Sequence, residues 1–416
     1  MKNGVVIVGA GHAGVQAAAG LREDGYDGPV ILVGDENELP YHKPPLSKTF
    51  IKDQEAKPQP LRGEAFYTGS TIDYRPGIRV DRIDAGRRLE LSGGGVLPFD
   101  RLILATGSRP RILPLPGSEL SGVASLRSLA DARLIRAFSA QSEDVVIVGG
   151  GFIGLEIAAT LKAAGREVTV VEAVDRLLGR AVAPVIARHV QQRLEATGVR
   201  ILTGTMIARL EGENGYVSAA ITTSGERLPA QMVIVGIGVV PNVELAQAAG
   251  ITIANGISVD QQMRTSVPEI LAIGDAASYR HWLTGGDVRL ESVQNATDQA
   301  RLAARTIVGH ADAFAAVPWF WSDIGDMKLQ MVGLISGSDS HVVLGDVNEN
   351  KFSIYHYAGN RLLGIESVNR PGDHMLGRKM LGAGFSPTPQ TVATGPDGLK
   401  AALAAFQKEE PVRAAE

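Results

Sequence analysis

Residues 5–14 read Val-Val-Ile-Val-Gly-Ala-Gly-His-Ala-Gly, an apolar run that leads into a glycine-rich turn. An apolar helix pattern continues from this turn to Leu21. A second apolar run fills positions 30–33, and the acids Asp35 and Glu36 follow it. Strand, glycine turn, helix, strand and acid, in this order, are the fingerprint of a dinucleotide-binding βαβ unit. The stretch therefore predicts a parallel sheet with a nucleotide at the carboxyl end of its first strand.

Each glycine of this turn has its own physical role. Gly9 permits the tight turn after the strand, and Gly14 permits the helix to pack against the sheet. Gly11 lets the backbone approach a pyrophosphate with no Cβ in the way. The helix that starts here directs free N–H groups and the positive end of its dipole at the phosphates. The acid about 20 residues further on accepts hydrogen bonds from a ribose.

The same pattern recurs in the middle of the chain. Residues 145–148 are apolar, the turn carries Gly149, Gly151 and Gly154, and Glu172 ends the next apolar run. Two complete fingerprints indicate either two bound dinucleotides or a gene duplication with one inactive site. Because both copies keep all three glycines and an acid, the sequence favours two working sites.

The composition narrows the class of protein. The chain has 416 residues, which is enough for two or three domains. Its net charge of -4 argues against nucleic acid as the main partner. No run of about 18 apolar residues predicts a membrane span. Lys2 and the apolar stretch after it resemble a secretion signal, but the first fingerprint occupies that stretch, so we expect a mature, cytoplasmic protein.

Cysteine is absent from the sequence. Structural disulfides, thiolate metal sites and a redox-active cysteine pair are therefore excluded, and no metal ligand set is predicted. Any electrons that enter the chain must leave it without passing through a thiol.

Three further segments carry motifs. Pro44 and Pro45 impose a stiff, extended turn before Lys48, where a helix is able to start. Residues 70–100 alternate apolar and polar positions around glycines and predict short hairpin strands. A buried strand at residues 101–104 ends in a small-residue turn, and the prolines after it indicate a crossing between domains.

The last third of the chain changes character. An apolar strand at residues 270–273 delivers Asp275 at its carboxyl end, where the ligands of open parallel sheets lie. A helix pattern from about Val293 to Ile307 follows it. From Pro318 onward, alternating stretches predict antiparallel strands.

These motifs together resemble a known family. The Ala105-Thr106-Gly107 turn and the Gly274-Asp275 pair are similar to those of the glutathione-reductase-like flavoproteins. Within that superfamily, residues 44–48, 291–293 and 318–323 resemble putidaredoxin-reductase-like enzymes, the NADH-dependent ferredoxin reductases that serve bacterial cytochrome P450 or ring-hydroxylating dioxygenase systems.

The resemblance implies an α/β fold with two Rossmann-like dinucleotide-binding domains, one for FAD and one for NAD, and a C-terminal α+β domain with an antiparallel sheet. The expected FAD-binding domain is split between residues 1–109 and 242–317. The expected NAD-binding domain spans residues 110–241, and the expected C-terminal domain spans residues 318–416.

The resemblance also implies two sets of cofactor-binding residues. The positions expected to bind FAD are Gly9, Gly11, Ala13, Gly14, Asp35, Glu36, Lys48, Val80, Ala105, Thr106, Gly107, Arg127, Asp275, Val293 and Trp321. The positions expected to bind NADH or NAD+ are Gly149, Gly151, Ile153, Gly154, Glu156, Glu172 and Gly238.

Three of these residues are expected at the reacting groups. Lys48 and Glu156 are predicted to pair beside the flavin and to tune the charge there, and Trp321 is predicted to lie against the nicotinamide. Simpler interpretations stay open for each assignment. Asp275 could cap a helix, Lys48 could be a solvated surface lysine, Arg127 could form a salt bridge between domains, and Trp321 could belong to the core.

The leading hypothesis for function is an NADH:ferredoxin reductase that passes electrons through FAD to a [2Fe-2S] ferredoxin, and so to a P450 or a dioxygenase. A monodehydroascorbate- or quinone-reducing flavoprotein and an NADH-sensing interaction protein similar to apoptosis-inducing factor are the alternatives. We expect a monomer or weak homodimer. Because a ferredoxin is typically acidic, Arg301, Arg305 and Lys328 are predicted to help form its docking rim.

Overall fold

The computed structural model describes residues 3–84, 86–179 and 181–413, so Lys2 of the signal-like start lies outside the described residues. The chain divides into two compact units. The first unit holds the residues up to Lys43 together with Lys57–Arg109 and Val239–Ala316. The second holds Pro44–Ala56, Pro110–Gly238 and the residues from Val317 onward.

The first unit is built on a parallel sheet in the strand order β20-β7-β1-β2-β3. Its strands are β1 (Val5–Val8), β2 (Val30–Val33), β3 (Ile72–Arg75), β7 (Arg101–Leu104) and β20 (Ile270–Ala272). All four residues of β1 are buried, as expected for a strand covered on both faces. The continuous apolar runs of the sequence therefore mark the centre of this sheet.

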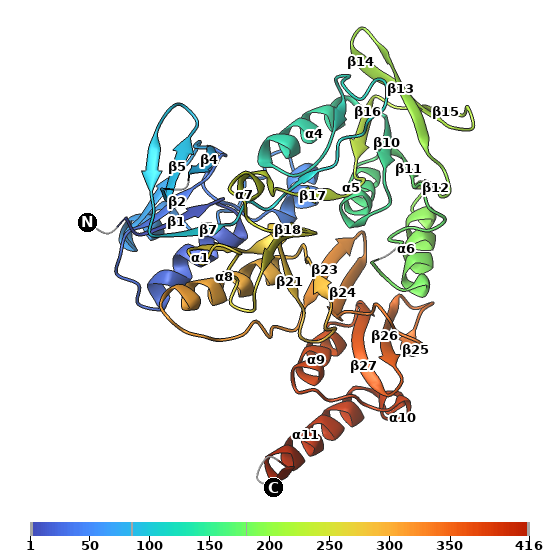
Figure 1. The fold of residues 1–416 in the computed structure, drawn as a ribbon. Helices are drawn as coiled ribbons and strands as arrows, with labels where there is room; N and C mark the ends of the chain where they lie inside the picture. The colour runs from blue at the N-terminus through green and yellow to red at the C-terminus, as the bar shows by residue number, and fades with distance from the viewer. Residues whose placement is uncertain (1–2, 85, 180, 414–416) are drawn as a thin grey trace. The chain divides into compact units, whose positions relative to one another are not determined.

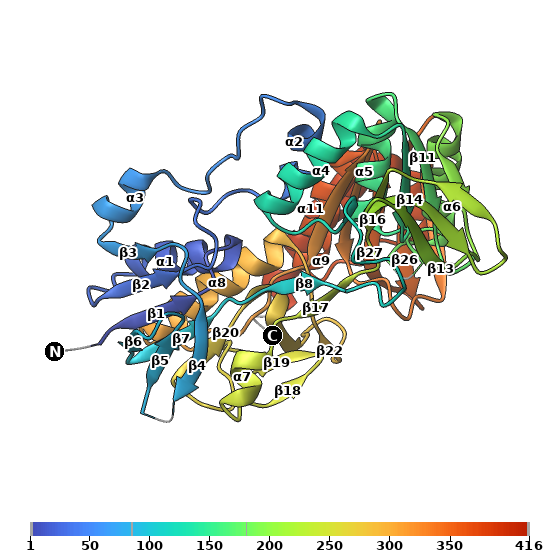
Figure 2. The ribbon, with the colours of Figure 1, turned by 90° about the horizontal axis from the view of Figure 1, so that it is seen from above.

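Two helices pack together on this sheet. They are α1 (His12–Glu23) and α8 (Val293–Ile307), which lie side by side in Figures 1 and 2. A Cβ added at Gly20 would lie 3.0 Å from the Cβ of Ala304, so the two helix backbones approach closely at this point. The segment after Ile270 thus returns to the sheet that the amino terminus begins, as the sequence predicts.

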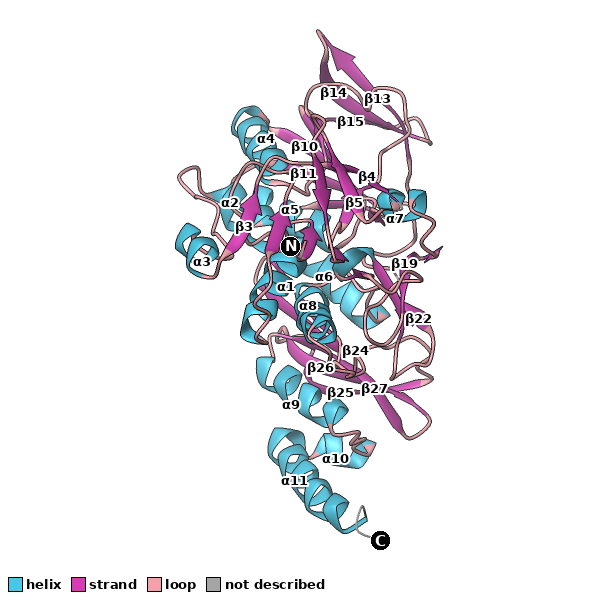
Figure 3. Cartoon of the chain, turned by 60° about the vertical axis from the view of Figure 1, so that its left-hand side comes forward, coloured by secondary structure: helices cyan, strands magenta, loops and turns pink. Residues whose placement is uncertain are grey.

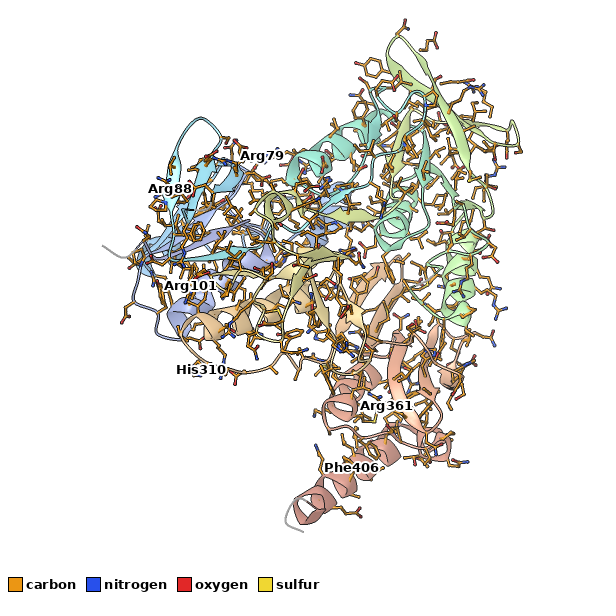
Figure 4. The ribbon with its side chains drawn as sticks, viewed as in Figure 1. Arg79, Arg88, Arg101, His310, Arg361 and Phe406 are labelled. Atoms are coloured by element: carbon orange, nitrogen blue, oxygen red, sulfur yellow. The ribbon has the colours of Figure 1, made fainter. Side chains whose placement is uncertain are left out.

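The region of residues 70–100 is only partly hairpin. β3 joins the parallel sheet beside β2, because its residues pair in register with Val30–Val33. The antiparallel sheet is made by β4 (Val80–Asp84), β5 (Arg88–Leu91) and β6 (Val96–Pro98), and Arg79 and Arg88 mark its place in Figure 4. The first strand of this stretch was therefore wrongly expected to be part of a hairpin.

Shorter elements complete the first unit. They are α3 (Glu64–Gly69), α7 (Glu244–Ala248), β17 (Val239–Pro241), β18 (Ile253–Ala254), β19 (Gly256–Val259), the 3-10 turn η2 (Gly274–Ala276), β21 (Ala277–Arg280) and β22 (Asp287–Val288). β8 (Ser108–Pro110) leads out of this unit.

The second unit repeats the same architecture. Its parallel sheet has the order β12-β11-β10-β16-β9. Its elements are β9 (Val123–Ala124), α4 (Leu129–Gln141), β10 (Asp144–Val148), α5 (Phe152–Ala163), β11 (Glu167–Val171), α6 (Pro184–Ala196), β12 (Arg200–Leu202) and β16 (Met232–Val235). An antiparallel sheet of β13 (Ile207–Glu213), β14 (Tyr216–Thr222) and β15 (Arg227–Pro229) lies in the same segment.

The C-terminal region adds an antiparallel sheet to the second unit, in the order β23-β24-β27-β26-β25. Its strands are β23 (Trp319–Ile324), β24 (Met327–Gly333), β25 (Ser340–Asp346), β26 (Lys351–Ala358) and β27 (Arg361–Val368). The helices are α9 (Pro371–Gly382), α10 (Pro389–Ala393) and α11 (Gly395–Arg413), which Figure 3 shows in cyan. α9 packs on β24 and β27, so this sheet has one face covered by a helix.

The segment that contains Lys48 belongs to the second unit, although the sequence places it inside the expected stretch 1–109. It forms the 3-10 turn η1 (Pro44–Ser47) and the short helix α2 (Thr49–Lys52). Phe50 is 3% exposed, and the guanidinium of Arg136 on α4 lies 4.3 Å from the centre of its ring. Burial of this aromatic side chain against α4 explains the grouping.

Within the described residues, no helix is both long enough and apolar enough to cross a membrane.

Two buried histidines predict how stability depends on pH. Burial lowers the pKa of His281 in the first unit to about 4. The pKa of His374 in the second unit is also lowered to about 4, mainly by burial and to a smaller extent by the positive charge of the nearby Arg378. Because the unfolded histidines have a pKa of about 6.5, the unfolded chain binds more protons as pH falls from about 6.5 to 4. The free energy of unfolding should therefore drop by about 2 kcal/mol for each histidine at pH 5.

Melting curves at pH 7 and pH 5 test this expectation. His374→Phe keeps an aromatic ring beside Trp319 and should reduce the fall in melting temperature between the two pH values. His310, which is exposed and labelled in Figure 4, provides the control variant His310→Gln. An equal fall in melting temperature from pH 7 to pH 5 for wild type and His374→Phe would contradict the expectation.

Candidate functional site

The first glycine turn lies at the carboxyl end of β1. Gly9 has φ +107°, and a Cβ there would lie 2.2 Å from the carbonyl oxygen of Ala105. A Cβ on Gly14 would lie 1.8 Å from the carbonyl oxygen of Gly9. The turn after β1, the turn after β7 and the start of α1 are therefore in backbone contact, and a side chain at either glycine would separate them.

The second turn is constructed in the same way. Gly149 has φ +108°, and a Cβ there would lie 2.4 Å from the carbonyl oxygen of Gly236, the residue that follows β16. A Cβ on Gly154 would lie 2.6 Å from the carbonyl oxygen of Gly149. The structure thus contains two copies of one backbone arrangement, one in each unit.

The middle glycine of each turn is different, because it faces open space. A Cβ on Gly11 would meet no atom within 4 Å, and a Cβ on Gly151 would meet only the carbonyl oxygen of Gly236 at 3.8 Å. Each is the N-cap residue of its helix, α1 or α5, and neither helix has a side chain that caps it. Uncapped N–H groups beside open space fit the phosphates of a dinucleotide.

The loops around the first turn are held by hydrogen bonds. The hydroxyl of Thr106 donates to the carbonyl oxygen of Asn242 at 2.7 Å, and the side-chain amide of Asn242 donates back to the carbonyl oxygen of Thr106 at 2.8 Å. The backbone N–H of Asn242 donates to the carbonyl oxygen of Gly107. Asn242 therefore holds the Ala105-Thr106-Gly107 turn in place through three hydrogen bonds, a role that the sequence analysis missed.

Asp275 lies in the same group of loops. The hydroxyl of Ser108 donates to its carboxylate at 2.9 Å, and Arg289 donates to its carbonyl oxygen at 2.9 Å. A Cβ on the neighbouring Gly274 would lie 3.1 Å from the Cβ of Ala13, so this motif sits against the first glycine turn.

The remaining first-unit positions are placed as follows. Val293 is the first residue of α8, and the side chain of Ser292 before it caps that helix. Val80 begins β4, and its side chain is 9% exposed in the core. Asp35 is exposed, whereas Glu36 accepts hydrogen bonds from Tyr41 and Lys43.

In the second unit, Glu172 faces the glycine turn directly. Its carboxylate accepts a hydrogen bond from the amide of Gly150 at 2.6 Å and another from the amide of Val174 at 3.0 Å. Arg176, the nearest cation in sequence, donates to the carbonyl oxygen of Gly179. A carboxylate at this turn is able to accept hydrogen bonds from a ribose and to repel a phosphate on it, which is the role that the family resemblance expects of Glu172.

Ile153 and Gly238 lie in the same segment. Ile153 is 44% exposed in the first turn of α5, and Gly238 is exposed after β16 with φ +96°. Both are therefore accessible beside the second glycine turn, where the family resemblance expects the nucleotide.

Glu156 on α5 is a buried acid of the second unit, at 6% exposure. Its carboxylate lies 2.9 Å from the ammonium of Lys48. The hydroxyl of Ser47 donates to it at 2.5 Å, and the hydroxyl of Ser322 on β23 donates at 2.6 Å. The predicted contact between Lys48 and Glu156 is present. Two serines that the sequence analysis did not single out complete the group.

The strand β23 separates its side chains into two faces, because successive residues of a strand point in opposite directions. Ser322 and Phe320 face α5, where the ring of Phe320 lies 4.8 Å from that of Phe152. Trp321 is half-buried on the opposite face, and its ring centre lies 5.6 Å from that of Trp319. Lys48 and Glu156 therefore lie on one side of β23, and Trp321 lies on the other.

Arg127 lies before helix α4, and the three predicted docking residues lie on α8 and β24. Arg127 precedes α4, and its amide donates to Asp131 in the capping box of that helix. Arg301 pairs with Asp298 at 3.1 Å, and Arg305 pairs with Asp312 at 2.6 Å. Lys328 is exposed on β24. The charges of both arginines are thus partly balanced by neighbouring acids.

Comparison with known proteins identifies the family. The family model "Pyridine nucleotide-disulphide oxidoreductase" matches residues 3–300, and the model "Reductase C-terminal" matches residues 319–403. The first match covers more than half of the chain. The chain belongs to the pyridine nucleotide-disulphide oxidoreductase family.

Individual relatives match over nearly the whole length. Rhodocoxin reductase of Rhodococcus erythropolis is 43% identical over 404 residues, which is 96% of this chain and 94% of the relative. The ferredoxin reductase for the CYP199A2 system from Rhodopseudomonas palustris has a TM-score of 0.94 at 43% identity, covering 97% of this chain and 100% of that one. Putidaredoxin reductase in its covalent complex with putidaredoxin has a TM-score of 0.93 at 38% identity, covering 97% and 99%.

The comparisons confirm the resemblance to putidaredoxin reductase and the predicted fold class. The protein is an oxidoreductase that uses FAD and NAD(H). The name of the family refers to a disulfide, but this chain has no cysteine. Within the described residues, no group of three histidine or acidic side chains is placed to hold a metal ion.

The two open glycines generate a paired prediction. Gly11→Ala should fold but lose FAD, and Gly151→Ala should fold and keep FAD but bind NAD+ at least about tenfold more weakly, because each new methyl occupies the space of one pyrophosphate. FAD content and titration with NAD+ measure the two effects. Gly63→Ala changes another N-cap glycine with open space around it and should alter neither. Normal FAD content in Gly11→Ala would contradict the assignment.

Glu172 generates a prediction about coenzyme choice. Wild type should prefer NADH over NADPH, and Glu172→Gln should narrow the ratio of kcat/KM values, because the amide no longer repels a 2′-phosphate. Glu167→Gln, at the exposed start of the same strand, is the control. An unchanged ratio in Glu172→Gln would place coenzyme selection elsewhere.

Proposed function

We propose that this protein is an NADH:ferredoxin reductase, which takes two electrons from NADH and delivers them singly to a [2Fe-2S] ferredoxin that serves a cytochrome P450 or a ring-hydroxylating dioxygenase. The names of its relatives, among them reductases of rhodocoxin and putidaredoxin, support this acceptor class. We also propose a cytoplasmic location, where NADH is available as the donor.

One observation carries the proposal: two dinucleotide turns of the same construction occur in a chain with no cysteine. One turn serves the electron donor and the other serves the flavin. FAD, when bound, accepts a hydride and releases electrons one at a time. Because no thiol lies between the flavin and the acceptor, the acceptor must approach the flavin itself.

The residues of the chain bind the two dinucleotides and orient their reacting rings. We assign the FAD phosphates to the turn at Gly11 and the NADH phosphates to the turn at Gly151, where N–H groups and helix dipoles face open space. We assign the Lys48–Glu156 pair to the reacting rings, where the two side chains set the local charge and exclude water. Ser47 and Ser322 each donate to one oxygen of the Glu156 carboxylate, so both oxygens of this buried acid are hydrogen-bonded.

The remaining assignments of the family resemblance stay proposals. They place Trp321 against the nicotinamide, Arg127 and Val80 at the adenine, Asp275 at the ribityl chain and Val293 at the flavin edge. Half-burial leaves part of the Trp321 ring accessible, as contact with a ligand requires.

Reduction of cytochrome c by NADH tests the proposed acceptor. The rate should be low with the purified protein alone and should rise at least about tenfold when a [2Fe-2S] ferredoxin is added. A high rate with a quinone and no response to any ferredoxin would favour the quinone-reducing alternative.

The docking hypothesis is tested with the same assay. Arg301→Glu should lower the ferredoxin-dependent rate, more so at low salt, because charges at the rim of an interface act mainly on association. NADH-to-ferricyanide activity should remain, since a small acceptor needs no docking face. Arg82→Glu is a matched control, because Arg82 is 59% exposed against 58% for Arg301 and is likewise paired with an acid. A parallel fall of both activities in Arg301→Glu would show a structural role instead.

A further inference from the structure

A buried acid of the C-terminal sheet binds the start of a helix in the nucleotide-binding segment. Glu366 on β27 is 1% exposed. The amide of Ala183 donates to both of its carboxylate oxygens, at 3.1 Å each. On its other side, Nε2 of His356 lies 2.8 Å from the same carboxylate. The acid therefore joins two segments that are 183 residues apart.

Helix α6 cannot cap itself. Its N-cap residue is Ala183, which has no side-chain acceptor, and its first helical residue is Pro184. In a capping box, a glutamate at the third helical position accepts the N-cap amide. That position is Ile186 here, so Glu366 supplies the missing carboxylate from another part of the fold. Its negative charge also complements the positive end of the helix dipole.

Two further side chains of α6 contact the C-terminal sheet and its turns. Nε2 of His189 lies 2.7 Å from the side-chain oxygen of Asn350, and its ring lies edge-on to Phe352 at 5.1 Å. One turn further along, Arg193 pairs with Asp326. The C-terminal sheet thus holds this helix at its start and at two positions further along.

The loop before α6 lies against the second glycine turn. The amide of Leu178 donates to the carbonyl oxygen of Gly150 at 2.9 Å, and the amide of Ala181 donates to the carbonyl oxygen of Leu178 at 2.8 Å. A Cβ on Gly150 would lie 2.6 Å from the side chain of Leu177, which is fully buried. Leu178 has φ +53°, a conformation that a leucine holds only when its surroundings impose it.

We propose that Glu366 is a positioning residue for NAD(H). By holding the start of α6, it keeps the preceding loop seated on the turn that binds the nucleotide. Glu366 does not touch the nucleotide, because its carboxylate is buried between His356 and Ala183. The inference deepens the proposed function and rests on NAD(H) binding at the turn around Gly151.

Removal of the acceptor is the first test. Glu366→Leu in the FAD-loaded protein should speed hydrogen exchange of the Ala183 amide and raise the Kd for NAD+ about threefold to tenfold, since the lost hydrogen bond is buried and charged. FAD content should stay at the wild-type level. Glu366→Gln, which keeps a carbonyl acceptor, should restore most of the affinity. Glu349→Gln changes an exposed acid at the turn between β25 and β26 and is the matched control.

Removal of the donor is the second test, and it leaves the C-terminal sheet unchanged. Ala183 has φ -61°, which suits proline, so Ala183→Pro deletes the N–H group with the backbone angle preserved. The Kd of the Ala183→Pro variant for NAD+ should rise by the same factor as that of Glu366→Leu. In the double variant the two effects should not add, because both remove one contact.

The outcomes separate the inference from the proposed function. If wild-type protein fails to bind NAD+, the proposed function is wrong. If wild type binds NAD+ but Glu366→Leu binds equally well with faster exchange at Ala183, the positioning role is wrong. Unchanged exchange at Ala183 would also overturn the inference. If Glu366→Leu does not fold, Ala183→Pro decides between these outcomes.

Discussion

Close approach of backbone to backbone at the end of a strand is the constraint on which this structure depends. At Gly9 and again at Gly149, the turn lies so near a neighbouring carbonyl group that no side chain fits. Only glycine adopts the positive φ of these turns without strain. The close contact brings the loops after β7 and β16 against the glycine turns. It leaves Gly11 and Gly151, with their uncapped helices, facing open space.

The buried carboxylate of Glu156 imposes a second constraint, within the second unit. A buried acid is costly unless it is hydrogen-bonded and balanced by a cation. Lys48 supplies the charge, and Ser47 and Ser322 supply the remaining hydrogen bonds. The need to satisfy one carboxylate therefore links the Pro44–Ala56 segment, helix α5 and the first strand of the C-terminal sheet. Glu366 has the same relation to α6, with the backbone amide of Ala183 as its donor.

A third feature is the balance of charge at the surface, where acids lie beside two of the exposed arginines. Arg301 and Arg305 each have an acidic neighbour, which partly balances the positive charge that they present. Exposed ion pairs are weak and exchange readily. On α9, by contrast, Arg378 and Lys379 are exposed and form no salt bridge within the described residues, and Arg378 lies over the ring of Trp319. The net charge of -4 therefore does not exclude local basic patches on this surface.

The sequence by itself determined both glycine turns, the strands that lead into them and the acids that follow, because these features depend on local spacing. It also predicted the contact between Lys48 and Glu156 through a family resemblance. Only the tertiary structure decided that β3 joins the parallel sheet, because the residues of this edge strand alternate between apolar and polar, as those of a hairpin strand do. It alone placed Ser47 and Ser322 on Glu156, across separations of 109 and 166 residues, and Glu366 on Ala183. Serine and glutamate carry no local signal of a distant partner, because such a contact exists only after the chain has folded.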